Sequence, residues 1–374
     1  MSNDPDTVPP PAKQRLASLD VLRGFDMFWI VGGDSLAQIF NRLGVPGKRV
    51  ADQFEHAQWE GFHFEDLIFP LFVFMAGMSL VFSLGGKMAE GGRGSALLRL
   101  GRRALLLVAL GILYYRGSKP DTIRVLGVLQ RIGIAYFGAG TLYLFFKPKS
   151  LIAWCAAILF GYWAMLAFIP VPGVGAGHFE EGRNLTNWID ENYLPGFKWD
   201  GRWDPEGLLS TLPAVGSCLL GVFAALIVRD PLKSHSERIR WFLVLGVSLL
   251  AAGYVWGFAF PIIKKLWTSS FVCYAGGLSF LLLALFYYLI DVRGWQRWSR
   301  PFLWIGMNSI AIYLIRNVVG FKALALRFTK GSVAQWFDIS LGSGTGDFVT
   351  NLLALVICLT IAYFLYSRKI FLRV

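Results

Sequence analysis

The sequence predicts an all-α integral membrane protein, a polytopic bundle of about ten transmembrane helices, and three observations lead to that prediction. Of the 374 residues, 55% are hydrophobic and only 16% are charged, against about 25% charged residues in an ordinary soluble domain. Apolar stretches of about 20 residues, the length that crosses the hydrocarbon core of a bilayer, recur along the chain. Phe (31), Trp (14) and Gly (41) are also numerous, as is usual in membrane helices and at their interfaces. This pattern excludes a soluble enzyme, a nucleic-acid-binding domain and a disulfide scaffold.

The predicted spans are separated mostly by short connections. They lie near residues 20–40, 64–86, 96–115, 124–146, 151–170, 206–228, 240–260, 268–290, 300–319 and 347–367. Three outer connections are longer, 41–63, 171–205 and 320–346, and connections of that length are usually functional or disordered. The Trp and Asn content of 171–205 favours an ordered binding lid. We predict one membrane domain over residues 15–374, after a polar, Pro-rich and disordered tail at 1–14.

The distribution of positive charge predicts the orientation in the membrane. More than half of the 36 Lys and Arg residues fall in the segments that lie inside if the N-terminus is inside. In short connections this bias sets the orientation, so both termini are predicted to be cytoplasmic and the protein to lie in a cytoplasmic (inner) membrane. The net charge of +12 is then mainly a topogenic signal, with anionic lipid as its neighbour.

Several ionisable side chains fall inside predicted spans, where a charge costs at least about 2.5–3.5 kcal/mol. The first span contains Arg23, Asp26 and Asp34, and the fourth contains Gln130 and Arg131. One interpretation is that Arg131 pairs with Asp26 and holds two helices in register; the other is a functional role for these residues. Asp34 lies at the outer end of its span, where water can reach it, and there we favour function.

Histidine is the side chain best suited to proton transfer near neutral pH, and the chain has four. His56 and His63 flank the entry to the second span, in FEHAQWEGFHFEDLIFP, and His178 lies in the long outer connection. Taken alone, His56 and His63 are interfacial hydrogen-bonding residues or catalysts. A metal site made of these two histidines with Glu65 and Asp66 lacks recognised zinc spacing, so no metal is predicted.

Five fragments carry a resemblance to a known family. They are RLASLDVLRG, HAQWEGFHFEDLIFPLFVFMAG, GVLQRIGIAYF, DPEGLLSTLPAVGSCLLGVFA and IGMNSIAIYL, in that order. The series resembles the heparan-α-glucosaminide N-acetyltransferase family, whose members transfer acetyl groups from cytosolic acetyl-CoA to a glucosamine amine across the membrane. The resemblance implies that His56 is the catalytic histidine and that Asp34 stands where the family has its partner Asn. A carboxylate can still hold the imidazole tautomer. The stretch between the two residues is longer than in the family.

Acetyl transfer needs a base for the amine proton, donors for the developing oxyanion and a site for the CoA phosphates. We expect His56 to act as the base or to carry the acetyl group, and Asp34 to orient it. The residues expected to bind acetyl-CoA are amides and arginines: Arg23, Gln130, Arg131, Asn308, Arg99, Arg102 and Arg103. For the last three, a positive-inside anchor without a ligand is the alternative. The residues expected to bind the amino sugar are Asp66, Asp204, Glu206, His178 and Trp203.

A proton-coupled transporter or flippase for a polar solute, with Asp26, Asp34 and Arg131 as a relay, is the alternative function. Neither paired broken helices nor an inverted repeat is evident in the sequence, which favours the enzyme. The resemblance also implies a possible homodimer.

Overall fold

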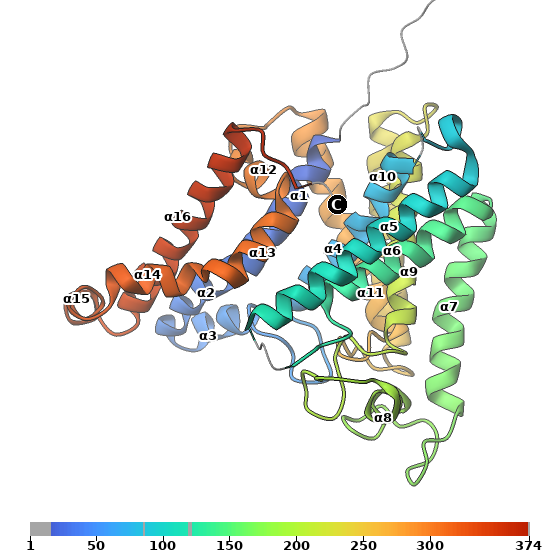
Figure 1. The fold of residues 1–374 in the computed structure, drawn as a ribbon, viewed down its shortest axis with the longest axis horizontal. Coiled ribbons are helices and arrows are strands. Elements are labelled where there is room, and N and C mark those ends of the chain that lie inside the picture. The colour runs from blue at the N-terminus through green and yellow to red at the C-terminus, as the bar shows by residue number, and fades with distance from the viewer. Residues whose placement is uncertain (1–15, 85–86, 119–121, 373–374) are drawn as a thin grey trace, which may run out of the picture.

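The computed structural model describes residues 16–84, 87–118 and 122–372. Within them the regular structure is helical and includes no β-strand, only two isolated bridges, Arg124 with Gly196 and Val171 with Gly175. The predicted all-α architecture is therefore confirmed for this part of the chain (Figure 1). The expected tail at 1–14 lies outside the described residues.

The helices follow one another along the whole described chain. In the first half they are α1 (Ala17–Phe28), η1 (Trp29–Gly33), α2 (Asp34–Ala37), η2 (Gln38–Leu43), α3 (Gly44–Asp52), α4 (Glu65–Leu84), α5 (Lys87–Ser118), α6 (Val128–Phe145), α7 (Pro148–Phe168) and α8 (Leu185–Tyr193). In the second half they are α9 (Thr211–Arg229), α10 (His235–Trp256), α11 (Ser269–Phe286), η3 (Tyr287–Val292), α12 (Arg300–Gly306), α13 (Ser309–Val319), α14 (Phe321–Thr329), α15 (Ser332–Leu341) and α16 (Thr345–Ser367).

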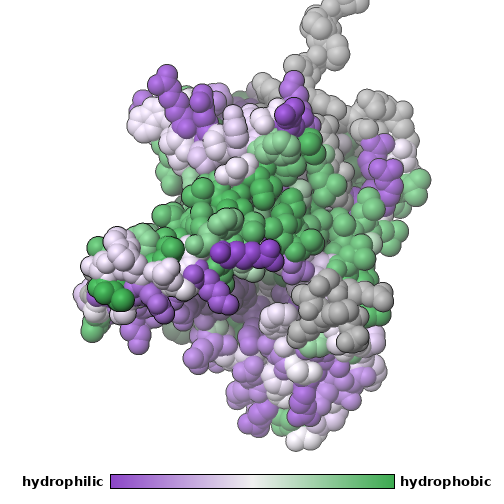
Figure 2. All heavy atoms as spheres, turned by 60° about the vertical axis from the view of Figure 1, so that its left-hand side comes forward, coloured by the Kyte–Doolittle hydropathy of each residue, from purple (hydrophilic) through white to green (hydrophobic). Residues whose placement is uncertain are grey.

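Six helices of the described chain are long and apolar enough to cross a membrane: α4, α7, α9, α10, α11 with η3, and α16. The bent pair α12–α13 makes a seventh if it is one span. Figure 2 shows an apolar belt between two hydrophilic layers, as expected for a protein surrounded by lipid. The count of about ten stays a prediction. The other three expected spans coincide with α1, which ends after 12 residues, and with α5 and α6, which carry several charged or polar residues.

The three long connections contain short helices of their own. Residues 41–63 include α3, residues 171–205 include α8, and residues 320–346 include α14 and α15. The α8 helix begins where the Asn184 side chain accepts a hydrogen bond from the Asn187 backbone N–H, a common way to satisfy the first free amide groups of a helix. We call the hydrophilic side that carries α8, at the bottom of Figure 1, the α8 face.

Small residues allow α4 and α9 to cross closely. A Cβ added to Gly77 would lie 1.9 Å from the carbonyl oxygen of Cys218, and one added to Gly221 would lie 1.8 Å from that of Phe74. Backbone contact of this kind is how membrane helices pack tightly in lipid. The crossing fixes the position of α4, whose first turn carries two acidic residues of the site described below.

Two helical segments of the described chain are broken. Between α1 and α2 the backbone of Gly32 has φ 137°, a conformation that favours glycine. Between α12 and α13 the axis bends by 80°. The sequence shows no sign of paired broken helices, and the structure has these two single breaks, at Gly32 and between Gly306 and Ser309. Neither break needs a proline, so neither is obvious from the sequence.

Candidate functional site

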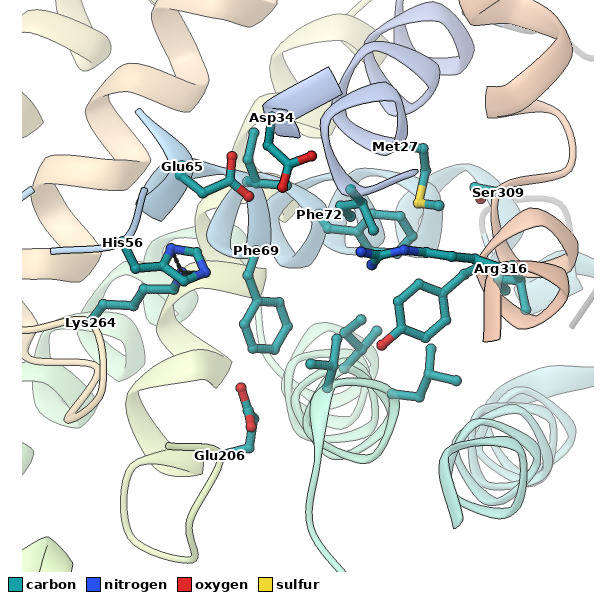
Figure 3. Close-up of a pocket in the computed structure, with 17 residues that line it drawn as sticks. Met27, Asp34, His56, Glu65, Phe69, Phe72, Glu206, Lys264, Ser309 and Arg316 are labelled. Atoms are coloured by element: carbon teal, nitrogen blue, oxygen red, sulfur yellow. Dashed lines mark hydrogen bonds between the residues drawn. The ribbon is translucent and has the colours of Figure 1, made fainter. Parts of the chain in front are cut away.

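A cavity of about 310 Å³ lies between α1, α4, α6 and α13, next to the α8 face. Its wall combines apolar side chains with six acidic or basic ones (Figure 3). The latter are Asp34, His56, Glu65, Glu206, Lys264 and Arg316. Pockets with an apolar lining and a few convergent polar groups are the usual form of a binding site for a small molecule.

His56 is held at the rim of this cavity by Asp66. Its Nδ1 atom lies 3.0 Å from Asp66 Oδ1, and its side chain is 58% exposed while that of Asp66 is fully buried. The backbone N–H groups of Ala57 and His63 donate to Asp66 Oδ2 at 3.1 and 3.0 Å. The loop that carries His56 thus folds around one carboxylate in the first turn of α4, which keeps the imidazole in place.

Lys264 completes the cluster from a distant part of the chain. Its Nζ atom lies 2.9 Å from His56 Nδ1 and 3.2 Å from Asp66 Oδ1. The two segments are tied together by the Gly61 N–H, which donates to the Ile262 carbonyl at 2.9 Å. Burial lowers the pKa of the Lys264 ammonium, and the Asp66 carboxylate opposes that shift. The sequence analysis missed Lys264, because a lysine beside an apolar stretch looks like any other residue of a hydrophilic connection.

The contacts of His56 determine what its ring can do. If Nδ1–H donates to the Asp66 carboxylate, the lone pair of Nε2 is free to accept a proton or to attack a carbonyl carbon. If Lys264 donates to Nδ1 instead, Nε2 carries the hydrogen and is not a base. Asp66 and Lys264 therefore compete for Nδ1. Only the arrangement in which Nδ1–H donates to Asp66 leaves Nε2 able to act as a base or a nucleophile.

Asp34 was expected to orient His56, but the structure places Asp66 against the ring instead. Asp34 lines the same cavity and points toward Glu65 (Figure 3), so the negative charge of Asp34 acts on Glu65. Among the described residues, Asp34 Oδ1 and Glu65 Oε2 have no hydrogen-bond partner. The reason is local: Asp34 begins α2 beyond the break at Gly32, whereas Asp66 lies directly under the loop that carries His56.

A second charged cluster lies beside the cavity, around Arg124. Its Nε and Nη2 atoms donate to the two oxygens of Asp204 at 2.8 and 2.5 Å, and Nη2 also donates to Glu206. Although burial disfavours the charged guanidinium, the two carboxylates raise its pKa. Burial raises the pKa of Glu206, and Arg124 opposes that shift. The Trp199 and Glu206 backbone N–H groups also donate to Asp204, which therefore has no oxygen left for an amino sugar.

The other residues expected to bind the sugar lie apart from the cavity. His178 Nδ1 is 3.3 Å from Glu180 Oε2 in the 171–205 segment, and the Trp203 ring packs beside Gly182. Neither lines the cavity. Of the five expected residues, only Glu206 reaches its wall, while Asp66 holds the His56 ring from behind.

The residues expected to bind acetyl-CoA divide into two groups. Gln130 and Arg131 are buried beside the Arg124 cluster: Gln130 donates to the Arg124 carbonyl at 3.2 Å, and Arg131 donates to Ser210 Oγ with its guanidinium 4.8 Å from the Trp267 ring centre. Among the described residues Arg131 makes no ion pair with Asp26, so the helix-register interpretation was wrong.

The second group lies on the far side of the cavity from α8. Asn308 is 2% exposed, and neither its amide nitrogen nor its oxygen has a partner among the described residues. Arg23 pairs with Asp20 at 3.3 Å and donates to Ser79 Oγ. Arg103 donates to the Tyr136 hydroxyl at 3.0 Å.

Arg99 and Arg102 are exposed on α5.

The described residues hold no group of three or more His, Cys, Asp or Glu side chains that could bind a metal ion.

Comparison with known proteins identifies the family. The profile described as "Heparan-alpha-glucosaminide N-acetyltransferase, catalytic" matches residues 15–252. The chain is 29% identical to the heparan-alpha-glucosaminide N-acetyltransferase of Homo sapiens over 96% of its own length, and 30% identical to that of Mus musculus over 86%. It spans 60% and 56% of the lengths of these two relatives. Because the profile covers more than half of the sequence, the chain belongs to the heparan-alpha-glucosaminide N-acetyltransferase catalytic family.

Proposed function

We propose that the protein is a membrane-embedded acetyltransferase that moves an acetyl group from acetyl-CoA to the amine of a glucosamine-type sugar. The observation that carries the proposal is the His56–Asp66–Lys264 cluster at the rim of a cavity, in a chain that belongs to a family of sugar N-acetyltransferases. A histidine oriented by a buried carboxylate is the arrangement that acyl transfer uses in unrelated enzymes.

In the proposed reaction, Nε2 of His56 accepts the proton that the sugar amine loses as it attacks the thioester carbonyl carbon. The carbon–sulfur bond breaks, CoA leaves as the thiolate, and the imidazolium returns the proton to it. A two-step route, in which Nε2 first takes the acetyl group, uses the same atoms. In both routes the Asp66 carboxylate stabilises the positive ring and fixes its orientation.

Acetyl-CoA would enter from the side opposite α8. The cavity extends from His56 along α4 and α1 to Ser309, the first residue of α13. Asn308, which is buried and has no side-chain partner among the described residues, adjoins this end, and the first N–H groups of α13 face the same break. A broken helix end and a free amide are suitable partners for the pantetheine amides. Arg23, Arg99, Arg102 and Arg103 remain our candidates for the phosphates.

In this proposal the α8 face is external, both termini are cytoplasmic, and the protein lies in a cytoplasmic membrane. The resemblance implies that it forms a homodimer there. The three connections that carry α3, α8 and α14–α15 would then surround the external entrance. The sugar amine would approach His56 past Glu206 and Glu65, whose carboxylates attract an ammonium group before it loses its proton.

The test uses the full chain purified in detergent, with acetyl-labelled acetyl-CoA and glucosamine or a glucosamine disaccharide. We expect label on the sugar nitrogen without any sealed vesicle. His56→Ala should abolish transfer while acetyl-CoA binding, measured by calorimetry, stays largely intact. Full activity of that variant would overturn the assignment of His56. His63→Ala is the matched control, because His63 lies in the same loop but its ring hydrogen-bonds to the Glu55 carbonyl and does not line the cavity.

The two helix breaks favour a second candidate, a proton-coupled transporter or flippase, because transporters often bind solutes at broken helices. The same purified protein in sealed vesicles separates the two functions. Uptake of a labelled amino sugar without an acetylated product would support the transporter, whereas an acetylated product formed in detergent supports the enzyme.

A further inference from the structure

One face of α13 forms the wall of the cavity opposite His56. Ser309, Ile310, Tyr313 and Arg316 all line the cavity, and their spacing places them on one side of a helix. The Tyr313 ring stacks on Tyr114 of α5, with ring centres 4.5 Å apart and planes 13° apart. Asn317 donates to the Tyr114 carbonyl. These contacts fix α13 against α5 and so fix where Arg316 stands.

Arg316 extends into the cavity, toward Phe72 and away from its own helix (Figure 3). Its side chain is exposed, so a ligand in the cavity can reach it. Within the described part of the chain no carboxylate lies within 4.0 Å of the guanidinium and no hydrogen bond from it is found. An arginine in a membrane helix is costly without a partner and usually indicates a functional site.

The cavity keeps its opposite charges apart. Asp34 and Glu65 lie together on the wall formed by α2 and α4, each with one oxygen that has no partner, and Arg316 faces them from α13. Their direct contact would satisfy all three groups, yet they stand apart across the cavity. A molecule that carries both an ammonium and an anionic group would pair with both walls at once.

We propose that Arg316 binds an anionic group on the acceptor sugar, so that the preferred acceptor is an amino sugar with a carboxylate, sulfate or phosphate substituent near its amine. This inference rests on the proposed acetyltransferase function. The acidic wall and His56 receive the amine, and the planar guanidinium takes the anion in a bidentate contact. The CoA phosphates are not its ligand, because they would lie toward the opposite face, whereas Arg316 is level with Tyr114 near the α8-face end of α5.

The test compares three acceptors in the full chain: glucosamine, glucosamine 6-sulfate, and the 3-O-lactyl ether of glucosamine, which carries a carboxylate. We expect kcat/KM for at least one anionic acceptor to exceed that for glucosamine about tenfold or more, the usual worth of a charge-assisted contact. Arg316→Gln should bring this ratio close to one, and Arg316→Lys should retain part of it. Lys322→Gln removes a charge from α14, outside this cavity, and should leave the ratio unchanged.

A different role for Arg316 predicts a different outcome. If it only balances the acidic wall, Arg316→Gln lowers the rates with neutral and anionic acceptors equally, and adding Asp34→Asn restores both; that result would overturn the inference. An unchanged ratio in Arg316→Gln would overturn it too. Calorimetry of the anionic sugars without acetyl-CoA tests this inference separately from the proposed acetyltransferase function. Loss of binding in Arg316→Gln supports the role of Arg316 even if no acceptor is acetylated.

Discussion

Two charged clusters lie within one region of the molecule and differ in how completely their groups are paired. Around Arg124, both oxygens of Asp204 and one of Glu206 accept hydrogen bonds from the guanidinium, which also lies 4.4 Å from the Tyr115 ring centre. Around the cavity, His56 shares one nitrogen between two partners, and Asp34 and Glu65 keep free oxygens.

The difference separates structural charge from functional charge. A buried polar group without a partner costs free energy that a stable fold normally avoids. Arg124 and Asp204 avoid that cost, so their pairing serves to hold the 196–206 segment to the connection that precedes α6. The groups around the cavity do carry that cost. Those that lack a partner among the described residues are the ones that can form hydrogen bonds or ion pairs with a substrate. Asp204, which we expected to bind the sugar, is instead part of the paired cluster.

The largest effect should come from Asp66→Asn. The Asn amide is uncharged, so it can neither favour the Nδ1–H tautomer of His56 as the carboxylate does nor stabilise the imidazolium. We expect kcat to fall by about 10²–10⁴-fold, as when the carboxylate of a catalytic triad becomes an amide. The thermal midpoint in detergent should fall as well, because the buried Asp66 carboxylate also pairs with Lys264, so kcat is compared at a temperature at which both proteins stay folded. Equal activity with wild type would place the chemistry elsewhere.

Arg124→Met should instead damage the fold. Two buried carboxylates would lose their counter-charge, and breaking a buried ion pair costs about 3–5 kcal/mol. We expect a lower unfolding midpoint in detergent, partly restored by adding Asp204→Asn. If Arg124→Met abolishes transfer without any loss of stability, the division between structural and functional clusters is wrong.

Asp190 tests the structural cluster through pH. Burial raises its pKa from 3.8 to about 6, while N–H groups of Leu208 and Asp204 oppose the shift. The folded state therefore binds this proton more tightly than the unfolded chain. The contribution to stability is complete below about pH 4 and is lost as the pH rises through about 6; two pKa units correspond to about 3 kcal/mol at most. Unfolding midpoints measured from pH 4 to 7 should decline in wild type and decline less in Asp190→Asn.

Lys264→Met should give the smallest effect, about tenfold in kcat at neutral pH, because the Asp66 carboxylate loses one charged partner while it keeps two backbone donors. Since the pKa of Lys264 is lowered by burial, the wild-type rate should fall on the alkaline side below the ordinary value of 10.5. The Met variant should lack this alkaline decline, and Lys264→Arg should shift it upward. An identical pH–rate profile in wild type and Lys264→Met would exclude Lys264 from the site.

The sequence was enough to predict the all-helical architecture with apolar spans, because it depends on local patterns, and it singled out His56, which the structure places at the rim of the cavity. Apolar runs indicate helices whatever their neighbours are, and the HAQWEG fragment carries its own resemblance. The pairing of side chains could not be predicted, because it depends on tertiary approach. Asp66, not Asp34, lies beside the His56 ring, because the break at Gly32 changes the direction of the chain before α2. The periodicity of the sequence does not reveal such a break.

The contact between His56 and Lys264 joins residues 208 positions apart, and this has a consequence for synthesis. The catalytic-family profile ends at residue 252, before Lys264 and before the whole of α13. A ribosome that has released only the profile region would have delivered the histidine and its carboxylate, but neither the lysine nor the cavity wall that carries Arg316. The site would therefore be complete only after the later helices have been made, because its two sides come from distant parts of the sequence.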